Sequence, residues 1–165
     1  MAEEVVTSDL VELLNEALAR ELQVSVQYML QHATEAGRMD KPTGKTLAAK
    51  QSKFVASHSY YMLPGVTLKK IAITEMRHAE AISERVVALG GRPTTQPAPI
   101  VTGETVMGML EDDREQERGA IALYTRIIGE AEKAGDAETA GLFRRILTDE
   151  EGHHRVFNAL LAREG

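Results

Sequence analysis

Apolar residues recur every three to four positions along four long stretches of the chain, a spacing typical of amphipathic α-helices. We expect these helices over approximately residues 8–37, 66–89, 103–133 and 137–161. At about 1.5 Å of rise per residue, such helices form a bundle ~35–45 Å long.

Capping residues, glycine and proline indicate where the helices begin and end. Thr7 or Ser8 can cap the first helix, and Gly37 is a candidate for its C-terminal cap. The glycine pair 90–91 ends the second helix. Asp136 closes a tight turn and is expected to cap the fourth helix.

The connections between the helices differ in character. Residues 38–64 begin with a loop around Pro42, and a shorter apolar pattern then predicts an extra short helix over residues 44–62. Residues 92–102 carry three prolines and cannot form a regular helix, so we expect a long extended crossover. The predicted fold is all-α: residues 1–165 form one antiparallel four-helix bundle.

Glutamate and histidine residues interrupt the apolar stripes of these helices. The second and fourth helices each carry a Glu-x-x-His motif, whose two ends project from one face. The first and third helices each carry a glutamate and a tyrosine seven residues apart, two turns along one face. The glutamates and histidines are Glu21, Glu75, His78, Glu117, Glu150 and His153, and the tyrosines are Tyr28 and Tyr124.

Four carboxylates that converge in an apolar core would repel one another, and most would have to hold protons. Two divalent cations remove this conflict, because four positive charges balance four negative ones. Oxygen and imidazole ligands without sulfur favour Fe, Mn or Zn over Cu(I), and they leave positions open for O2, peroxide or water. A structural polar network explains any one of these residues, whereas the six together favour a dinuclear metal site. We interpret His32 and His58 as packed, hydrogen-bonded histidines.

Composition excludes several other classes of protein. The formal net charge of the 165 residues is −6, which argues against a nucleic-acid partner. The absence of cysteine excludes disulfides, thiolate metal sites and iron–sulfur clusters. The chain begins without a basic secretory segment and has no apolar run of membrane-spanning length, so we expect a cytoplasmic protein without a membrane partner.

Five blocks of the chain carry a resemblance to a known family. They are Leu14-Asn15-Glu16 through Glu21, Gln27-Tyr28, Glu75-Met76-Arg77-His78-Ala79-Glu80, Asp113 with Glu117, and Leu147-Thr148-Asp149-Glu150-Glu151-Gly152-His153. At these residues the chain resembles the ferritin-like superfamily, and most closely bacterioferritin. The resemblance implies a ferritin-like bundle that holds two irons within each subunit.

The resemblance also implies a role for each residue of the site. Glu75 and Glu150 would bridge the irons. Glu21 with His78 would hold one iron, and Glu117 with His153 would hold the other. Asp113, one turn before Glu117, is our candidate for accepting the free N–H of a ligand histidine. Tyr28 and Tyr124 either hydrogen-bond the carboxylates or serve as redox-active phenols.

Assembly is the aspect in which the chain departs from bacterioferritin. The 44–62 segment is extra, and no fifth helix follows Leu161, which is similar to the mini-ferritins that protect DNA. A second apolar face predicts a two-fold homodimer, and we expect a dodecameric shell in preference to a 24-mer or an isolated dimer. The residues of that face are Val24, Val26, Met29, Leu30, Ile73 and Met76. Met76 follows Glu75, where bacterioferritins carry a haem-ligating methionine, so it is a candidate haem ligand; the alternative is an ordinary interface methionine.

Three function classes fit these features. The first is a ferroxidase of iron storage or detoxification, which oxidises Fe(II) with O2 or hydrogen peroxide. The second is a di-iron or di-manganese peroxidase or catalase, resembling rubrerythrin or manganese catalase, which stores no mineral. The third is a metal carrier or structural bundle without enzymatic activity. We expect the ferroxidase.

Overall fold

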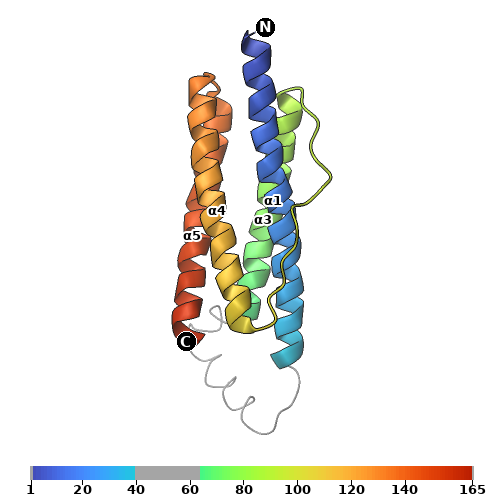
Figure 1. The fold of residues 1–165 in the computed structure, drawn as a ribbon, viewed down its shortest axis with the longest axis vertical. Helices are drawn as coiled ribbons and strands as arrows, with labels where there is room; N and C mark the ends of the chain where they lie inside the picture. The colour runs from blue at the N-terminus through green and yellow to red at the C-terminus, as the bar shows by residue number, and fades with distance from the viewer. Residues whose placement is uncertain (1, 40–63, 165) are drawn as a thin grey trace.

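A computed structural model describes residues 2–39 and 64–164, with side chains described for residues 8–34 and 67–162. The described part of the chain is all helical apart from its connections, and it forms a four-helix bundle (Figure 1). The helices are α1 (Ala2–Met39), α3 (Pro64–Ala88), α4 (Val106–Lys133) and α5 (Ala137–Glu164).

The helices are arranged as two antiparallel hairpins, α1 with α3 and α4 with α5 (Figure 1). The connection from α3 to α4 runs the length of the bundle along α1, as the proline content of residues 92–102 predicted. Asn15 holds this crossover with both ends of its amide, donating to the Arg92 carbonyl at 3.1 Å and accepting from the Thr94 N–H at 2.7 Å. The Ala98 N–H donates to the Ala19 carbonyl at 2.8 Å. The crossover thereby fixes where α4 begins.

Polar side chains define the ends of α4 and α5. Thr105 caps α4 by accepting from the Gly108 N–H at 3.0 Å. Asp136 accepts from the Thr139 N–H at 2.9 Å, which confirms the predicted cap of α5. Arg85 near the end of α3 is 2.8 Å from Asp136, so the same carboxylate also ties α3 to the α4–α5 turn. The turn itself passes through Gly135 at φ 72°, a conformation that glycine adopts without strain.

Three predicted boundaries differ from the observed ones. α1 begins at Ala2 rather than after Thr7 or Ser8, because the residues before this candidate cap are themselves helical. Gly37 lies inside α1, since one glycine costs a helix only about 1 kcal/mol and does not end it. α4 begins at Val106, because Thr105 rather than Gly103 provides the cap. The predicted 44–62 helix lies outside the described residues.

Two apolar layers fill the bundle, one on each side of its middle. One layer joins the N-terminal half of α1 to the C-terminal halves of α3 and α4, and the other joins the opposite halves. In the first layer the rings of Tyr124 and Phe143 lie 5.3 Å apart, and in the second those of Tyr28 and Phe157 lie 5.5 Å apart. A polar level is left between the layers, at the middle of all four helices. None of the described helices is both long and apolar enough to cross a membrane.

Candidate metal centre

All six residues predicted from the Glu-x-x-His and Glu/Tyr patterns meet at this polar level. Glu21 comes from α1, Glu75 and His78 from α3, Glu117 from α4, and Glu150 and His153 from α5. None of the four carboxylate residues is more than 2% exposed, and His78 is 6% exposed. Charged groups are this deeply buried in proteins only when they are paired or coordinate metals.

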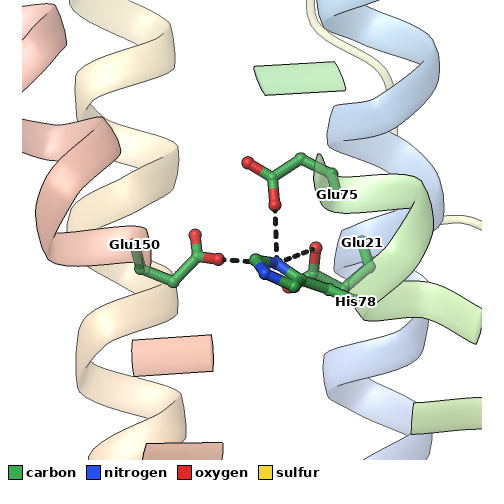
Figure 2. A group of neighbouring side chains, drawn as sticks. All are labelled: Glu21, Glu75, His78 and Glu150. Atoms are coloured by element: carbon green, nitrogen blue, oxygen red, sulfur yellow. Dashed lines mark hydrogen bonds and ion pairs between the residues drawn. The ribbon is translucent and has the colours of Figure 1, made fainter. Parts of the chain in front are cut away.

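His78 directs Nδ1 at three of the carboxylates (Figure 2). The nitrogen is 2.9 Å from Glu75 Oε2 and 3.0 Å from Glu150 Oε1. Glu21 Oε2 lies at 3.7 Å. One imidazole nitrogen therefore faces carboxylates from three different helices.

His153 makes the corresponding arrangement on the other side of the centre. Its Nδ1 is 2.8 Å from Glu75 Oε1 and 3.8 Å from Glu117 Oε2. The two imidazole rings lie 6.3 Å apart. Two groups of four possible ligands result, and within each group the ligand atoms lie within 4.8 Å of one another. The groups are Glu21, Glu75, His78 and Glu150, and Glu75, Glu117, Glu150 and His153. Glu75 and Glu150 belong to both.

The charges in this cluster displace the pKa values of its members. Burial, reinforced by the charge of Glu75, raises the pKa of Glu21 to about 7. Burial and the charges of Glu21 and Glu75 raise the pKa of Glu150 to about 8. For Glu75, the short contacts with both histidines and their positive charges outweigh burial and lower the pKa to about 2. Burial also raises the pKa of Glu117. Without metal, three of the four carboxyls thus resist ionisation.

The histidines supply the positive charge of the metal-free cluster. Burial disfavours the imidazolium of His78, but Glu150, Glu21 and Glu75 outweigh it and raise the pKa of His78. Burial is likewise outweighed at His153, where Glu75 and Glu117 raise the pKa. Cations that replace these protons would allow all four carboxyls to ionise, so the donor set is suited to metal ions.

Unpaired atoms test whether metal ions fit this donor set. Several buried atoms of the cluster have no hydrogen-bond partner among the described residues, because their short contacts lack the alignment of hydrogen bonds. They are Glu21 Oε2, Glu75 Oε1, Glu117 Oε2, Glu150 Oε1 and His153 Nδ1. Such atoms are costly unless they bind something. Carboxylate oxygens and imidazole nitrogens without sulfur fit Fe, Mn or Zn.

The tyrosines pair with the cluster across the bundle. Tyr28 on α1 donates its hydroxyl to Glu117 Oε1 on α4, and Tyr124 on α4 donates to Glu21 Oε1 on α1. Each tyrosine uses one oxygen of a glutamate, and the other oxygen is among the unpaired atoms. Two roles were open for the tyrosines, and these contacts correspond to the first, which was hydrogen bonding to the carboxylates.

The prediction that Asp113 accepts a hydrogen bond from a ligand histidine is wrong. Among the described residues Asp113 accepts from no histidine: its Oδ1 accepts from Gln27 at 3.0 Å and Gln31 at 2.9 Å, because this face of α4 packs against α1. Asp149 lies beside His78 instead, with its Oδ2 3.2 Å from Nε2. The only signal for Asp149 was its position next to Glu150, and it lies off the inward stripe.

Two other predicted residues lie away from the cluster. Met76 is 55% exposed on the outer face of α3, and His32 is half-buried on α1. His58 lies outside the described residues.

Val24, predicted to face a partner subunit, is instead 3% exposed and packs in the core layer with Tyr28, because it lies three residues from Glu21 on the inward face.

Comparison with known proteins places this geometry in a family. Residues 64–164 match the model of the ferritin-like domain, Ferritin. Over 144 residues the chain is 38% identical to a bacterioferritin of Desulfovibrio desulfuricans, covering 87% of this chain and 69% of that protein. A Streptomyces coelicolor bacterioferritin is 33% identical over 146 residues, covering 88% and 75%.

Solved structures agree. An X-ray structure of the D. desulfuricans bacterioferritin, described by its diiron site in different catalytic states, superposes with a TM-score of 0.79 and 34% identity over 97% of this chain and 82% of that one. The Mycobacterium tuberculosis bacterioferritin gives 0.76 at 24% identity over 93% and 84%, which shows the fold alone.

The chain belongs to the ferritin-like family. Within that family it is bacterioferritin-like, and its buried glutamate and histidine cluster is consistent with a diiron ferroxidase site.

Proposed function

We propose that this protein is a ferroxidase that oxidises Fe(II) with O2 or hydrogen peroxide for iron storage or detoxification. The observation that carries the proposal is the pair of four-residue groups that share Glu75 and Glu150 and retain unpaired atoms. Fe(II) is the substrate, and the family membership supports iron as the metal over Mn or Zn, which the same ligands accept.

Each of the six residues has a role in this proposal. Glu21 and His78 hold one ion, Glu117 and His153 hold the other, and Glu75 and Glu150 bridge the two. When bound, a pair of iron ions supplies two electrons to the oxidant and a template on which the oxidant binds.

The surrounding residues keep the ligands in position. Tyr28 and Tyr124 each hold one carboxylate oxygen of a terminal ligand, so that the other oxygen is free for the metal. Asp149 accepts a hydrogen bond from Nε2 of His78, so that Nδ1 would be the nitrogen that binds the metal once His78 has lost its second proton. The apolar layers above and below limit access of water to the ligands.

Substitutions of ligands on α4 and α5 test the ferroxidase proposal. With Fe(II) and O2 or peroxide, the wild type should oxidise iron much faster than Glu117→Ala or His153→Ala, because each variant loses a ligand to the same ion. Glu115→Ala, an exposed glutamate on the helix of Glu117, is the matched control and should keep the wild-type rate. Equal rates in all four proteins would contradict the proposal. Rapid peroxide consumption without iron deposition would favour the rubrerythrin-like peroxidase instead.

We also propose that the chain forms a two-fold homodimer through the apolar face of α1 and α3. The exposed apolar residues that support it are Val26, Met29, Leu30, Ile73 and Met76. Family membership implies an oligomeric iron-handling protein. The dodecamer expected from the sequence stays a prediction.

We further propose that Met76, on this apolar face of α1 and α3, is a haem ligand. The thioether of Met76 is accessible in the single chain, and a thioether can ligate haem iron. After expression with ample haem, the wild type should show a Soret band that Met76→Leu lacks. A wild type without this band would leave Met76 as an apolar interface residue.

A further inference from the structure

Two buried oxygen atoms outside the metal centre also lack a hydrogen-bond partner among the described residues. They are Oδ2 of Asp113 on α4 and Oε1 of Gln31 on α1. Asp113 is 0% exposed and Gln31 2% exposed, so solvent does not reach either side chain freely. While Asp113 is ionised both atoms are acceptors only, and a buried acceptor without a donor is costly.

The two side chains are already joined by one hydrogen bond. Gln31 Nε2 donates to Asp113 Oδ1 at 2.9 Å. The atoms left over from this bond are Gln31 Oε1 and Asp113 Oδ2, the two unpaired oxygens. A carboxyl and a carboxamide are both planar groups with two polar atoms at one edge, and they match each other in a second bond as soon as the carboxyl carries a proton.

We propose that Asp113 holds a proton and donates it to Gln31 Oε1, so that acid and amide form a closed pair of hydrogen bonds between α4 and α1. A single proton satisfies both unpaired atoms. The inference does not depend on metal binding, because the side-chain partners of Asp113 are Gln27 and Gln31.

The surroundings of Asp113 favour its neutral form. Burial raises the pKa of this carboxyl to about 7, against the opposing hydrogen bonds from Gln31 and Gln27, and the neighbouring Asp112 on α4 adds to the rise. Burial raises the pKa of the Tyr28 phenol on α1, and the charges of Glu117 and of an ionised Asp113 add to the rise. Burial and the charge of Asp112 thus favour a protonated Asp113 at and below neutral pH.

The pair gives Asp113 a positioning role beside the metal centre. Gln27 donates to Asp113 Oδ1 at 3.0 Å and accepts from the Val101 N–H of the crossover at 2.9 Å. Asp113 therefore joins α1, α4 and the crossover one turn away from Glu117. As the pH rises past neutrality the proton leaves, the second bond is lost, and this junction loosens.

Infrared spectroscopy of the full chain labelled with carboxyl-13C aspartate tests the protonation directly. At pH 6 the wild type should show the C=O band of a protonated aspartic acid, absent from Asp113→Asn. In Gln31→Met the band should shift, because the acceptor Oε1 is gone. Only ionised aspartate in the wild type at pH 6 would overturn the proposal, and would leave a water or a cation between the two oxygens.

The melting temperature of Asp113→Asn gives an independent readout, since the asparagine amide supplies a permanent N–H to Gln31 Oε1. A folded-state pKa raised above the unfolded value means stability that is present at low pH and lost as pH rises. The melting temperature of Asp113→Asn relative to wild type should therefore increase from about pH 4 to about pH 7 and then stay constant. Glu111→Gln, an exposed carboxyl on α4, should show no such rise. A variant that unfolds, or a difference that is flat with pH, would contradict the proposal.

Discussion

At the scale of single residues, the two oxygens of Glu21 differ in their contacts, and so do those of Glu117. Tyr28 binds Oε1 of Glu117 and Tyr124 binds Oε1 of Glu21, while Oε2 of both glutamates stays unpaired. Among the described residues the bridging candidates Glu75 and Glu150 accept from no tyrosine hydroxyl, and both belong to both ligand groups. This distribution suits two terminal and two shared carboxylates.

The raised pKa values predict that metal binding weakens as the pH falls. Glu21 and Glu150, with pKa values of about 7 and about 8, hold protons that incoming ions must displace. Affinity should therefore fall as the pH decreases through about 8 and 7, with protons released on binding. Calorimetric titration with Zn²⁺ in two buffers of different ionisation enthalpy measures this release. No proton release at pH 6.5 would contradict the assignment.

The contact between Asp149 and His78 predicts a selective loss of affinity. Removing the carboxylate in Asp149→Ala leaves the His78 tautomer undefined, and the loss of such a partner typically weakens metal binding about 10–100-fold. The weakened ion should be one of the two, because His153 keeps its own contacts. Glu151→Ala, the exposed neighbour on α5, is the control and should bind both ions as the wild type does.

At the scale of helices, apolar periodicity predicted the four helices, and the prolines of residues 92–102 predicted the crossover. The Glu-x-x-His and Glu/Tyr spacings predicted the six clustered residues. The site prediction succeeded because the apolar stripe that packs the core also includes Glu21 and Glu75. A charged residue in such a stripe is costly and therefore indicates a functional site. Contacts between helices were not accessible in the same way. Spacing along α1 pairs Tyr28 with Glu21, yet the hydroxyl of Tyr28 binds Glu117.

Other residues were missed for the same physical reason. Asp149 lies off the inward stripe of α5, so only the packing of α3 against α5 reveals its contact with His78. Asp113 is on the stripe, but its partners depend on which face of α1 lies opposite. Helix ends were uncertain because Thr7 and Ser8 resemble a cap equally well when they lie inside a helix.

The cap of α5 predicts a graded loss of stability at Asp136. Asp136→Ala removes both the cap to Thr139 and the ion pair with Arg85, and loss of the cap alone costs about 0.5–2 kcal/mol. Asp136→Asn keeps a capping oxygen and should lose less. Urea unfolding measures both free energies of unfolding. Equal losses in the two variants would mean that the cap contributes little.

At the scale of the whole molecule, the polar level sits between two apolar layers, so substitutions at the metal centre need not disrupt the core. Exposed apolar residues gather on the outer face of α1 and α3, where Leu30 is 49% exposed and Met76 55% exposed. Exposed apolar area on this scale marks an interaction surface.

Light scattering at micromolar concentration tests the proposed dimer. The wild type should have a mass of at least two chains, and Leu30→Glu should shift the mass towards that of a single chain, because burying an unpaired charge opposes association. Ala122→Glu adds the same charge at an exposed position of α4 and should leave the mass unchanged. A wild-type mass of one chain would contradict the dimer. A mass of two chains would contradict a storage shell.

The most direct test of the central claim is an anaerobic Fe(II) titration of the metal-free protein. We expect a tight class that saturates at about two ions per chain, the capacity of the two-metal carboxylate site. Glu75→Ala should lose both ions, since Glu75 belongs to both ligand groups, whereas the exposed Glu80→Ala should keep both. Saturation at one ion or none in the wild type, or loss of a single ion in Glu75→Ala, would contradict a dinuclear centre bridged by this residue.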